Sequence, residues 1–335
     1  MDSLIERFLR GENELTIIQL GYVAMSTELV NSSPSQTMTY AQFQKIKNTE
    51  AAIRKLERIA KSNLENCLRL LKHNKGNDIH FFRLSSRLIP LANHEALEGW
   101  DYLTPLKNEL KELGDYAKKE KMRIGFHPDH FVLLNSPKKE ILQASVQMLA
   151  LHVRLLEGMG IDSTHRCVLH VGGGYDDKEL SLERFIHNWM YTPKKIQETI
   201  ILENDDTTFT LLDTLYLCEK LNVPMVFDYH HHMACHETKE WEKDWGRVVD
   251  TWKNSPLPVK MHISSPKNEQ EFRSHADYVD VDWFFSFLNK VKGSTEQIDC
   301  MIEAKQKDAA LFRLMEKIKK RDDIELIDAS TFRIK

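Results

Sequence analysis

The sequence predicts an α/β fold, a single (β/α)8 barrel of the TIM type that spans residues 1–335. Three observations support this prediction. Eight short apolar runs rich in β-forming residues recur along the chain. Segments with helical periodicity lie between these runs, and strands that alternate with helices form parallel βαβ units. Finally, most of the runs end in metal-binding side chains, and barrel enzymes place their active sites at this carboxyl-terminal rim. A doubly wound open sheet is the alternative arrangement.

The expected strands recur at intervals that leave room for a helix. They are Leu15–Val23, Asp78–Ser85, Met122–His127, Arg166–Val171, Glu198–Asn204, Pro224–Asp228, Pro258–Ser264 and Asp299–Ala304. The expected helices include Thr49–His73, Tyr102–Glu120, Lys138–Gly158, Thr210–Leu221 and Ala309–Lys319. Eight such units fit within 335 residues, so the length does not require a second domain.

The composition is that of an ordinary globular chain, with 41% hydrophobic residues and only 13 glycines and 10 prolines, which argues against disordered linkers. No run of 18 apolar residues is present, so we expect no membrane partner. The first residues, "MDSLIERFLRGENEL", mix acids with bases and lack an apolar signal core. The five cysteines are scattered and odd in number, which indicates reduced thiols. We therefore expect a cytoplasmic protein.

The net charge is -4, so no global basic field indicates a nucleic-acid partner. This lowers the expectation of DNA binding but does not exclude it. Bound divalent ions would add positive charge at one spot and reverse the local sign.

The ends of the predicted strands are the main functional signal. Six of the eight end in a residue type that binds metal: His127, His170, Glu203, Asp228, His262 and Glu303. The other two end in Tyr22 and Arg83. Any one of these residues could be a satisfied core or rim group. Because buried charge is costly and these residues all fall at one end of the strands, the set as a whole predicts a metal site at the rim.

The segment "VFDYHHH", Val226–His232, adds histidines directly after the sixth strand. Its D-x-x-H spacing, Asp228 and His231, lets the chain turn once so that both side chains face the rim. The residues alone do not eliminate His230 or His232. One of these two is expected to hydrogen-bond a ligand or to be solvated.

Nine motifs in order resemble the UV-damage endonuclease family, within the xylose-isomerase-like barrels that include endonuclease IV. They begin with "LGYVA" at Leu20, "FRLSSRLIPLANH" at Phe82, "GFHPDHF" at Gly125, "LHVGGGYDDK" at Leu169 and "LENDD" at Leu202. They continue with "VFDYHHH" at Val226, "VKMHISSPK" at Val259, "SHADYVD" at Ser274 and "MIEAKQKD" at Met301. Together they cover nearly the whole chain.

The resemblance implies an ATP-independent DNA repair endonuclease that uses no nucleotide cofactor. It would hydrolyse the phosphodiester immediately 5′ to cyclobutane pyrimidine dimers and 6-4 photoproducts, with some activity on abasic sites, leaving 3′-hydroxyl and 5′-phosphate ends. The implied partner is double-stranded DNA that carries UV lesions, and the implied cofactor is Mn²⁺, as two to three ions, with Zn²⁺ or Mg²⁺ as alternatives. We expect a monomer that associates with the nucleoid during repair.

The resemblance also assigns the ligands. His127, His170 and Glu203 would hold one ion, and Glu203 would bridge to a second ion completed by Asp228, His262 and Glu303. His231 and His275 would hold a third ion; His275 does not end a strand, and only the resemblance points to it. Glu203 and Lys260 are the expected catalytic residues. Lys260 stands two residues before His262 and, by the V-K-M-H match, is expected to be carboxylated.

Lesion contacts are expected from three residues. In the family a Gln–Tyr pair after a histidine-proline probes the duplex, whereas this chain has His130 and Phe131 there. Phe131 keeps a stacking face, but His130 alters the hydrogen-bonding wedge and leaves the range of lesions open. Tyr22 matches a tyrosine of the family and is expected to line the pocket for flipped bases.

Two other functions remain open on the residues alone. A metal-dependent sugar isomerase or epimerase on the same barrel would need two ions and a closed pocket for a small polyol. The additional histidines His231 and His275 favour three ions and therefore phosphate chemistry. A non-catalytic nucleic-acid-binding module is the third possibility, and the metal-ligand rim argues against it.

Overall fold

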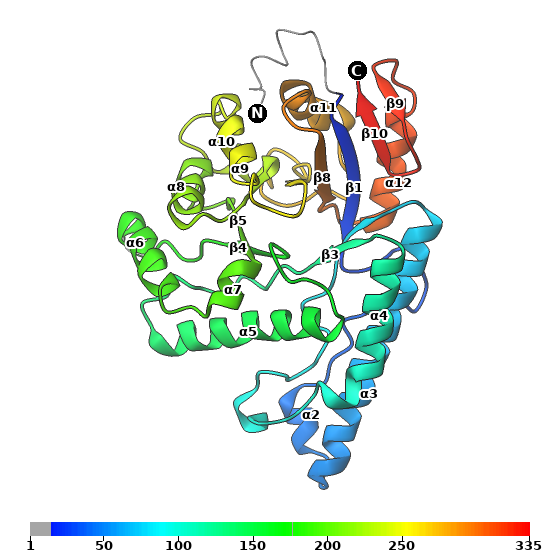
Figure 1. Cartoon of the computed structure of the whole chain (residues 1–335), viewed down its shortest axis with the longest axis vertical. Helices are drawn as coiled ribbons and strands as arrows, with labels where there is room; N and C mark the ends of the chain where they lie inside the picture. Colours follow the sequence, from blue (N-terminus) through cyan, green and yellow to red (C-terminus); the bar gives the residue numbers. More distant parts are fainter. Residues whose placement is uncertain (1–14, 176) are drawn as a thin grey trace.

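The computed structural model describes residues 15–175 and 177–335, and eight parallel strands form the centre of the protein (Figure 1). The strands are β1 Ile17–Val23, β2 Phe81–Arg83, β3 Arg123–Gly125, β4 Cys167–His170, β5 Ile200–Glu203, β6 Met225–Asp228, β7 Val259–Ile263 and β8 Gln297–Ile302. Their order is β3-β2-β1-β8-β7-β6-β5-β4. A single bridge between Phe126 and Cys167 joins the two ends of this sheet. The predicted (β/α)8 barrel is therefore confirmed.

Helices connect successive strands and pack around the barrel. They are α2 Tyr40–Gln44, α3 Thr49–Gly76, α4 Lys107–Lys119, α5 Lys139–Gly158, α6 Lys178–Trp189, α7 Lys194–Thr199, α8 Leu211–Leu221, α9 Tyr229–Ala234, α10 Glu242–Asp250, α11 Val281–Val291 and α12 Lys307–Ile318. The five helices predicted by residue range correspond to α3, α4, α5, α8 and α12. Within the described residues, no helix is both long enough and apolar enough to cross a membrane.

Two strands after the barrel were not predicted. Strands β9 Ile324–Leu326 and β10 Thr331–Ile334 form an antiparallel pair, and β10 also pairs antiparallel with the first residues of β1. The last residues of β1 pair instead with β2. The amino-terminal half of β1 is thus covered by β10, which satisfies backbone groups that β2 is too short to reach.

The alternation of side chains along each strand divides the barrel interior from the outer layer. On β1, Gln19 points inward, because its amide contacts Arg123 of β3 and Gln297 of β8. Tyr22 has the opposite parity and packs outward, against the helices.

A projecting segment is built from the loops that follow β1 and β2. Helix α2 and the first half of α3 extend away from the barrel, at the lower end of Figure 1. A small satellite core, formed by Met38, Phe43, Ala52, Leu56 and Leu97, holds this segment together. Both contributing loops follow the carboxyl ends of their strands, so the segment belongs to the same rim as the predicted site.

Candidate metal centre

Six of the predicted ligands lie together at the carboxyl ends of the barrel strands. They are His127, His170, Glu203, Asp228, His262 and Glu303. Strand pairing explains the convergence, because His170 is in register with Glu203 and Asp228 is in register with His262. Inward parity then points all of these side chains into the mouth of the barrel.

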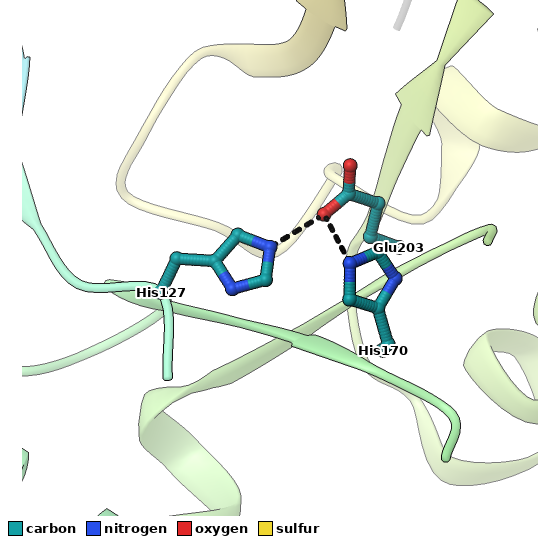
Figure 2. A group of neighbouring side chains, drawn as sticks. All are labelled: His127, His170 and Glu203. Carbon is teal, nitrogen blue, oxygen red and sulfur yellow. Dashed lines mark hydrogen bonds and ion pairs between the residues drawn. The ribbon is translucent and has the colours of Figure 1, made fainter. Parts of the chain in front are cut away.

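Glu203 is the centre of the cluster, and its carboxylate is fully buried. Its Oε2 lies 2.9 Å from Nε2 of His127 and 3.7 Å from Nε2 of His170 (Figure 2). Its Oε1 lies 2.7 Å from Nδ1 of His262. One carboxylate therefore contacts imidazoles from three different strands or strand ends.

Two groups of potential ligand atoms share Glu203. His127, His170 and Glu203 offer atoms that all lie within 4.8 Å of one another, and so do Glu203, Asp228 and His262. Glu303 adjoins the second group, with its Oε1 3.2 Å from Nδ1 of His262. This geometry has the form of two neighbouring cation sites joined by one carboxylate.

The donor atoms fit divalent cations. Buried polar atoms normally find hydrogen-bond partners, yet Oδ2 of Asp228, Nε2 of His262 and Nδ1 of His170 are buried and find none among the described residues. A mixture of imidazole and carboxylate suits manganese or zinc better than calcium. The unpaired Oδ2 of Asp228 and the donor chemistry of the set therefore both support a site for such ions.

Burial and the neighbouring charges shift the pKa values of the acids and imidazoles in the cluster. Burial opposes ionisation of Glu203, but the neighbouring imidazoles outweigh it and hold its pKa well below the usual value. Burial lowers the pKa of His170 to about 4 and raises the pKa of Asp228 to about 6. Burial also opposes the charge on His231, but Asp228, Glu203 and Glu303 raise its pKa to about 9.

Three of the histidines predicted as ligands have one ring nitrogen close to a backbone carbonyl oxygen. Nδ1 of His127 lies 3.0 Å from the oxygen of Pro128, and Nδ1 of His231 lies 3.0 Å from that of Asn204. Nδ1 of His275 donates to the oxygen of Glu303 at 2.7 Å. Metal-binding histidines commonly donate their other N–H to a carbonyl in this way, which leaves Nε2 for the ion.

His231 and His275 form the outer part of the cluster. Their ring centroids are 6.1 Å apart, and the ring of His231 lies 5.6 Å from that of His170. The structure therefore brings His275 to the rim from the loop after β7, where no strand-end rule would have placed it.

The three consecutive histidines point in different directions because they lie on a helix, where each residue turns the side chain by about 100°. Asp228 caps this helix, α9, by accepting a hydrogen bond from the amide of His231 at 2.7 Å. His231 faces the mouth. His232 is buried beside Phe227 and His236, so it belongs to the core. The predicted turn at Asp228 is thus an N-cap.

His230 is held by two hydrogen bonds. Its Nε2 donates to the carbonyl of Phe272, and its Nδ1 accepts from the hydroxyl of Ser264, both at 2.6 Å. The carbonyl can only accept, so this tautomer is fixed by its partners. Phe272 stands three residues before His275, and the rings of His230 and His275 lie 5.5 Å apart. His230 therefore anchors the loop that presents His275.

Two residues of the site were not assigned a role from the sequence. Asn204 exchanges two hydrogen bonds with the backbone of Asp228, each 2.9 Å long, and so positions the end of β6. Arg83 ends β2 and forms an ion pair with Glu303. Burial opposes ionisation of Glu303, but Arg83 holds its pKa below the usual value. The position of Arg83 at a strand end was the available signal.

Lys260 lies inside the barrel, one level below His262. Its ammonium sits 5.3 Å from the centroid of the Phe81 ring, and burial lowers its pKa to about 8. Among the described residues it forms no ion pair within 4.0 Å. A buried amine without a paired carboxylate is unusual, because burying a charge is costly.

Tyr22 does not lie where it was predicted. Its side chain is 0% exposed, its hydroxyl hydrogen-bonds Oδ1 of Asn74 on α3 at 2.6 Å, and its ring packs 4.9 Å from that of Phe82. Burial raises its pKa. The cause is strand parity, which turns Tyr22 outward beneath the helices, so it offers no surface to a base.

His130 and Phe131 lie on the rim loop after β3. Phe131 is 71% exposed, and the two rings are 4.0 Å apart. A cavity of about 180 Å³ lies beside them; its lining includes His130, His170, Gly172 and Asp205. An exposed aromatic ring thus stands next to a hollow that reaches His170 of the candidate ligand cluster.

Comparison with known proteins gives concordant results. The family described as UV-endonuclease UvdE matches residues 18–334. A UV DNA damage endonuclease of Halalkalibacterium halodurans is 52% identical over 314 residues, covering 93% of this chain and 98% of that one. A solved structure described as SacUVDE superposes with a TM-score of 0.79 at 29% identity, covering 90% of this chain and 98% of that chain. Endonuclease IV from Thermus thermophilus, at 14% identity and a TM-score of 0.51, shares the fold.

Proposed function

This chain belongs to the UV-endonuclease UvdE family, and on this basis we propose that it is a DNA repair endonuclease that incises the strand immediately 5′ to UV photoproducts. The expected products are a 3′-hydroxyl and a 5′-phosphate, formed without ATP. Cyclobutane pyrimidine dimers and 6-4 photoproducts are the proposed substrates, with abasic sites as further candidates.

The observation that carries this proposal is the sharing of Glu203 by two ligand groups in the mouth of the barrel. We propose that His127, His170 and Glu203 hold one ion. Glu203, Asp228, His262 and Glu303 would hold a second, and His231 and His275 a third. Divalent ions of this kind, Mn²⁺ first among them, supply an activated water and neutralise charge on the phosphate.

The protein groups would perform the positioning. Glu203 would keep two cation sites in fixed relation, because each of its oxygens faces a different set of imidazoles. The carbonyls behind His127, His231 and His275 would fix the ring orientations. Asn204 would hold Asp228 in place through the backbone.

Lys260 is proposed to be carboxylated and to join this set. Its depressed pKa provides the neutral amine that reacts with carbon dioxide, and the resulting carbamate would turn an unpaired cation into an anionic ligand. An intact mass without one added carbon dioxide, together with electron density for a bare ammonium, would remove this assignment.

Lesion recognition is proposed to use the exposed loop after β3. Damage weakens stacking and pairing, so a damaged base pair opens at lower free-energy cost than an intact one. Phe131 is exposed enough to fill the vacated stack, and His130 beside it would contact the opened bases. The neighbouring cavity could receive part of the displaced nucleotide.

The decisive experiment is incubation of the purified protein with supercoiled plasmid and Mn²⁺, without ATP. Nicking confined to UV-irradiated plasmid supports the proposal, and mapping of an end-labelled lesion duplex tests the position and the end groups of the cut. Intact irradiated plasmid together with ketose–aldose conversion would instead support the sugar isomerase. A plasmid with abasic sites measures the additional substrate.

A further inference from the structure

One part of the projecting segment at the rim carries a strong local charge. Residues 40–61, which we name the basic arm, contain six basic and two acidic residues, a net charge of +4. The whole chain carries -4, so the remaining residues together carry -8. The arm is therefore positive on a protein that is otherwise acidic.

The cations of the arm are free to meet a partner. Lys45, Lys47, Lys55 and Arg58 are exposed and form no ion pair with any residue in the described ranges. By contrast, Arg54 pairs with Glu50, and Lys61 pairs with Glu109. Four of the six positive charges thus have no ion-pair partner among the described residues.

The arm presents these charges on a rigid support. Ala52, Leu56 and Ala60 of α3 are buried, and Arg54 and Arg58 lie on the opposite face of the same helix. Thr39 and Gln42 form a capping box at the start of α2, and Asn48 caps α3 by accepting from the amide of Ala51. The backbone beneath Lys55 and Arg58 is therefore already ordered, so binding costs no further backbone ordering at these two positions.

The arm also stands on the correct side of the barrel. It lies in the connection after β1, whose carboxyl end opens on the same rim as Glu203. Helix α3 has 28 residues and is about 42 Å long, whereas β1 has 7 residues and spans only about 23 Å. The first half of α3 therefore extends past the rim, as Figure 1 shows.

We propose that the basic arm is a second contact surface for the sugar-phosphate backbone of duplex DNA, to one side of the nucleotides held at the metal centre. The inference rests on the proposed function for its partner. Charge complementarity selects that partner, because backbone phosphates attract lysine and arginine without regard to sequence. The arm supplies affinity for the duplex, while the rim cluster and the loop at Phe131 remain responsible for chemistry and lesion choice.

The test compares two variants with the same net charge. In the arm variant, Lys45, Lys47, Lys55 and Arg58 are replaced by Gln. In the matched control, Gln replaces four lysines at the opposite end of the barrel, Lys292, Lys317, Lys319 and Lys320, which are also exposed. Affinity of the manganese-loaded proteins for an undamaged duplex is measured by fluorescence anisotropy over a series of salt concentrations.

The arm variant is expected to bind roughly tenfold or more weakly, and its plot of log K against log salt should become less steep by about 0.9 for each lost contact. The control should keep the wild-type slope. An unchanged slope in the arm variant overturns the proposal, and so does an equal loss in both variants, which would indicate a general field effect. An undamaged duplex is used, so the result stands whether or not irradiated plasmid is nicked.

A second measurement separates the arm from the chemistry. One substrate is a lesion duplex that is truncated so that it does not reach the basic arm. On this short duplex the arm variant and the wild type should incise at the same rate. On a long lesion duplex the arm variant should show a raised KM with an unchanged kcat. A fall in kcat on both substrates would place these residues in the catalytic site and would contradict the proposal.

Discussion

The two ends of the barrel interior are both lined by charged residues, but only one end satisfies them. At the amino-terminal end, Arg123 donates two hydrogen bonds to Asp299, at 2.5 and 2.6 Å, and a third to Gln19. Gln297 donates a further bond to Asp299 at 2.8 Å. At the mouth, Asp228, His262 and His170 each keep a buried atom without a hydrogen-bond partner in the described ranges.

The contrast indicates that charged residues at the two ends of the barrel axis have different roles. A buried ion pair whose hydrogen bonds are complete holds strands together, whereas incompletely paired donor groups are retained where a ligand completes them. Asp299 and Asp228 illustrate this difference, since Asp299 lies in the amino-terminal network whereas Asp228, at the carboxyl end of β6, keeps an unpaired Oδ2. Position along the strand, and not residue type, separates the carboxylate of the amino-terminal network from the one that we propose to bind an ion.

Glu203→Ala should disrupt the ligand cluster at the mouth of the barrel and should have the largest effect on activity. Loss of the shared carboxylate removes one ligand from both groups, and incision should fall by at least about a thousandfold. The chain should still unfold cooperatively, because the amino-terminal network is untouched. Nicking of irradiated plasmid and thermal unfolding measure the two quantities. Undiminished turnover would contradict the role given to Glu203.

Arg123→Ala should break the structural end. It leaves the buried carboxylate of Asp299 without its cation, and such a loss lowers the free energy of unfolding by about 3–5 kcal/mol. Urea unfolding measures the change. At a temperature where the variant remains folded, its manganese content should equal that of the wild type. A variant that loses its ions but keeps its stability would reverse the proposed division.

His230→Ala should distinguish the outermost ion from the inner ions in the mouth of the barrel. The variant releases the carbonyl of Phe272 and loosens the loop that carries His275, so affinity for the outermost ion should fall by about 10- to 100-fold. The inner ions should remain. Manganese titration followed by atomic absorption counts the ions. His230→Gln can still donate to the carbonyl and should restore much of the affinity, which a purely structural role would not predict.

Phe131→Ala should have the smallest effect and should leave both ends of the barrel intact. Loss of one stacking ring is expected to weaken lesion binding by about 1–3 kcal/mol. Ion content and unfolding should not change. Binding of a lesion duplex and of its undamaged counterpart, measured side by side, tests this expectation. Lost ions with unaltered lesion affinity would count against a wedge at this position.

Much of the fold and of the inner cluster could be predicted because both obey simple periodicity. Alternating strands and helices indicated the barrel, and six strand ends supplied the acids and imidazoles around Glu203. Tyr22 was misplaced because both faces of β1 are buried, and an apolar run that is buried on both faces carries no signal of which face is inward.

Other features depend on contacts that no local pattern contains. The tie between His230 and Phe272 joins residues 42 positions apart, and the pairing of β10 with β1 joins the two ends of the fold. His275 could be anticipated only from resemblance, because it follows a loop. Arg83 was visible at a strand end, but its pairing with Glu303 required the three-dimensional arrangement.

Strands β3 and β4 are joined only by the bridge between Phe126 and Cys167, among the described residues. Two backbone hydrogen bonds form this bridge, from the amide of Phe126 to the oxygen of Arg166 at 2.7 Å and from the amide of Val168 to the oxygen of Phe126 at 2.9 Å. His127 follows β3 and His170 ends β4, so the two histidines lie on opposite sides of this bridge. A cation bound by both histidines would cross-link β3 and β4. Amide hydrogen exchange along these two strands should therefore slow when manganese is added. The ion proposed to support incision would thereby also stabilise the closed barrel.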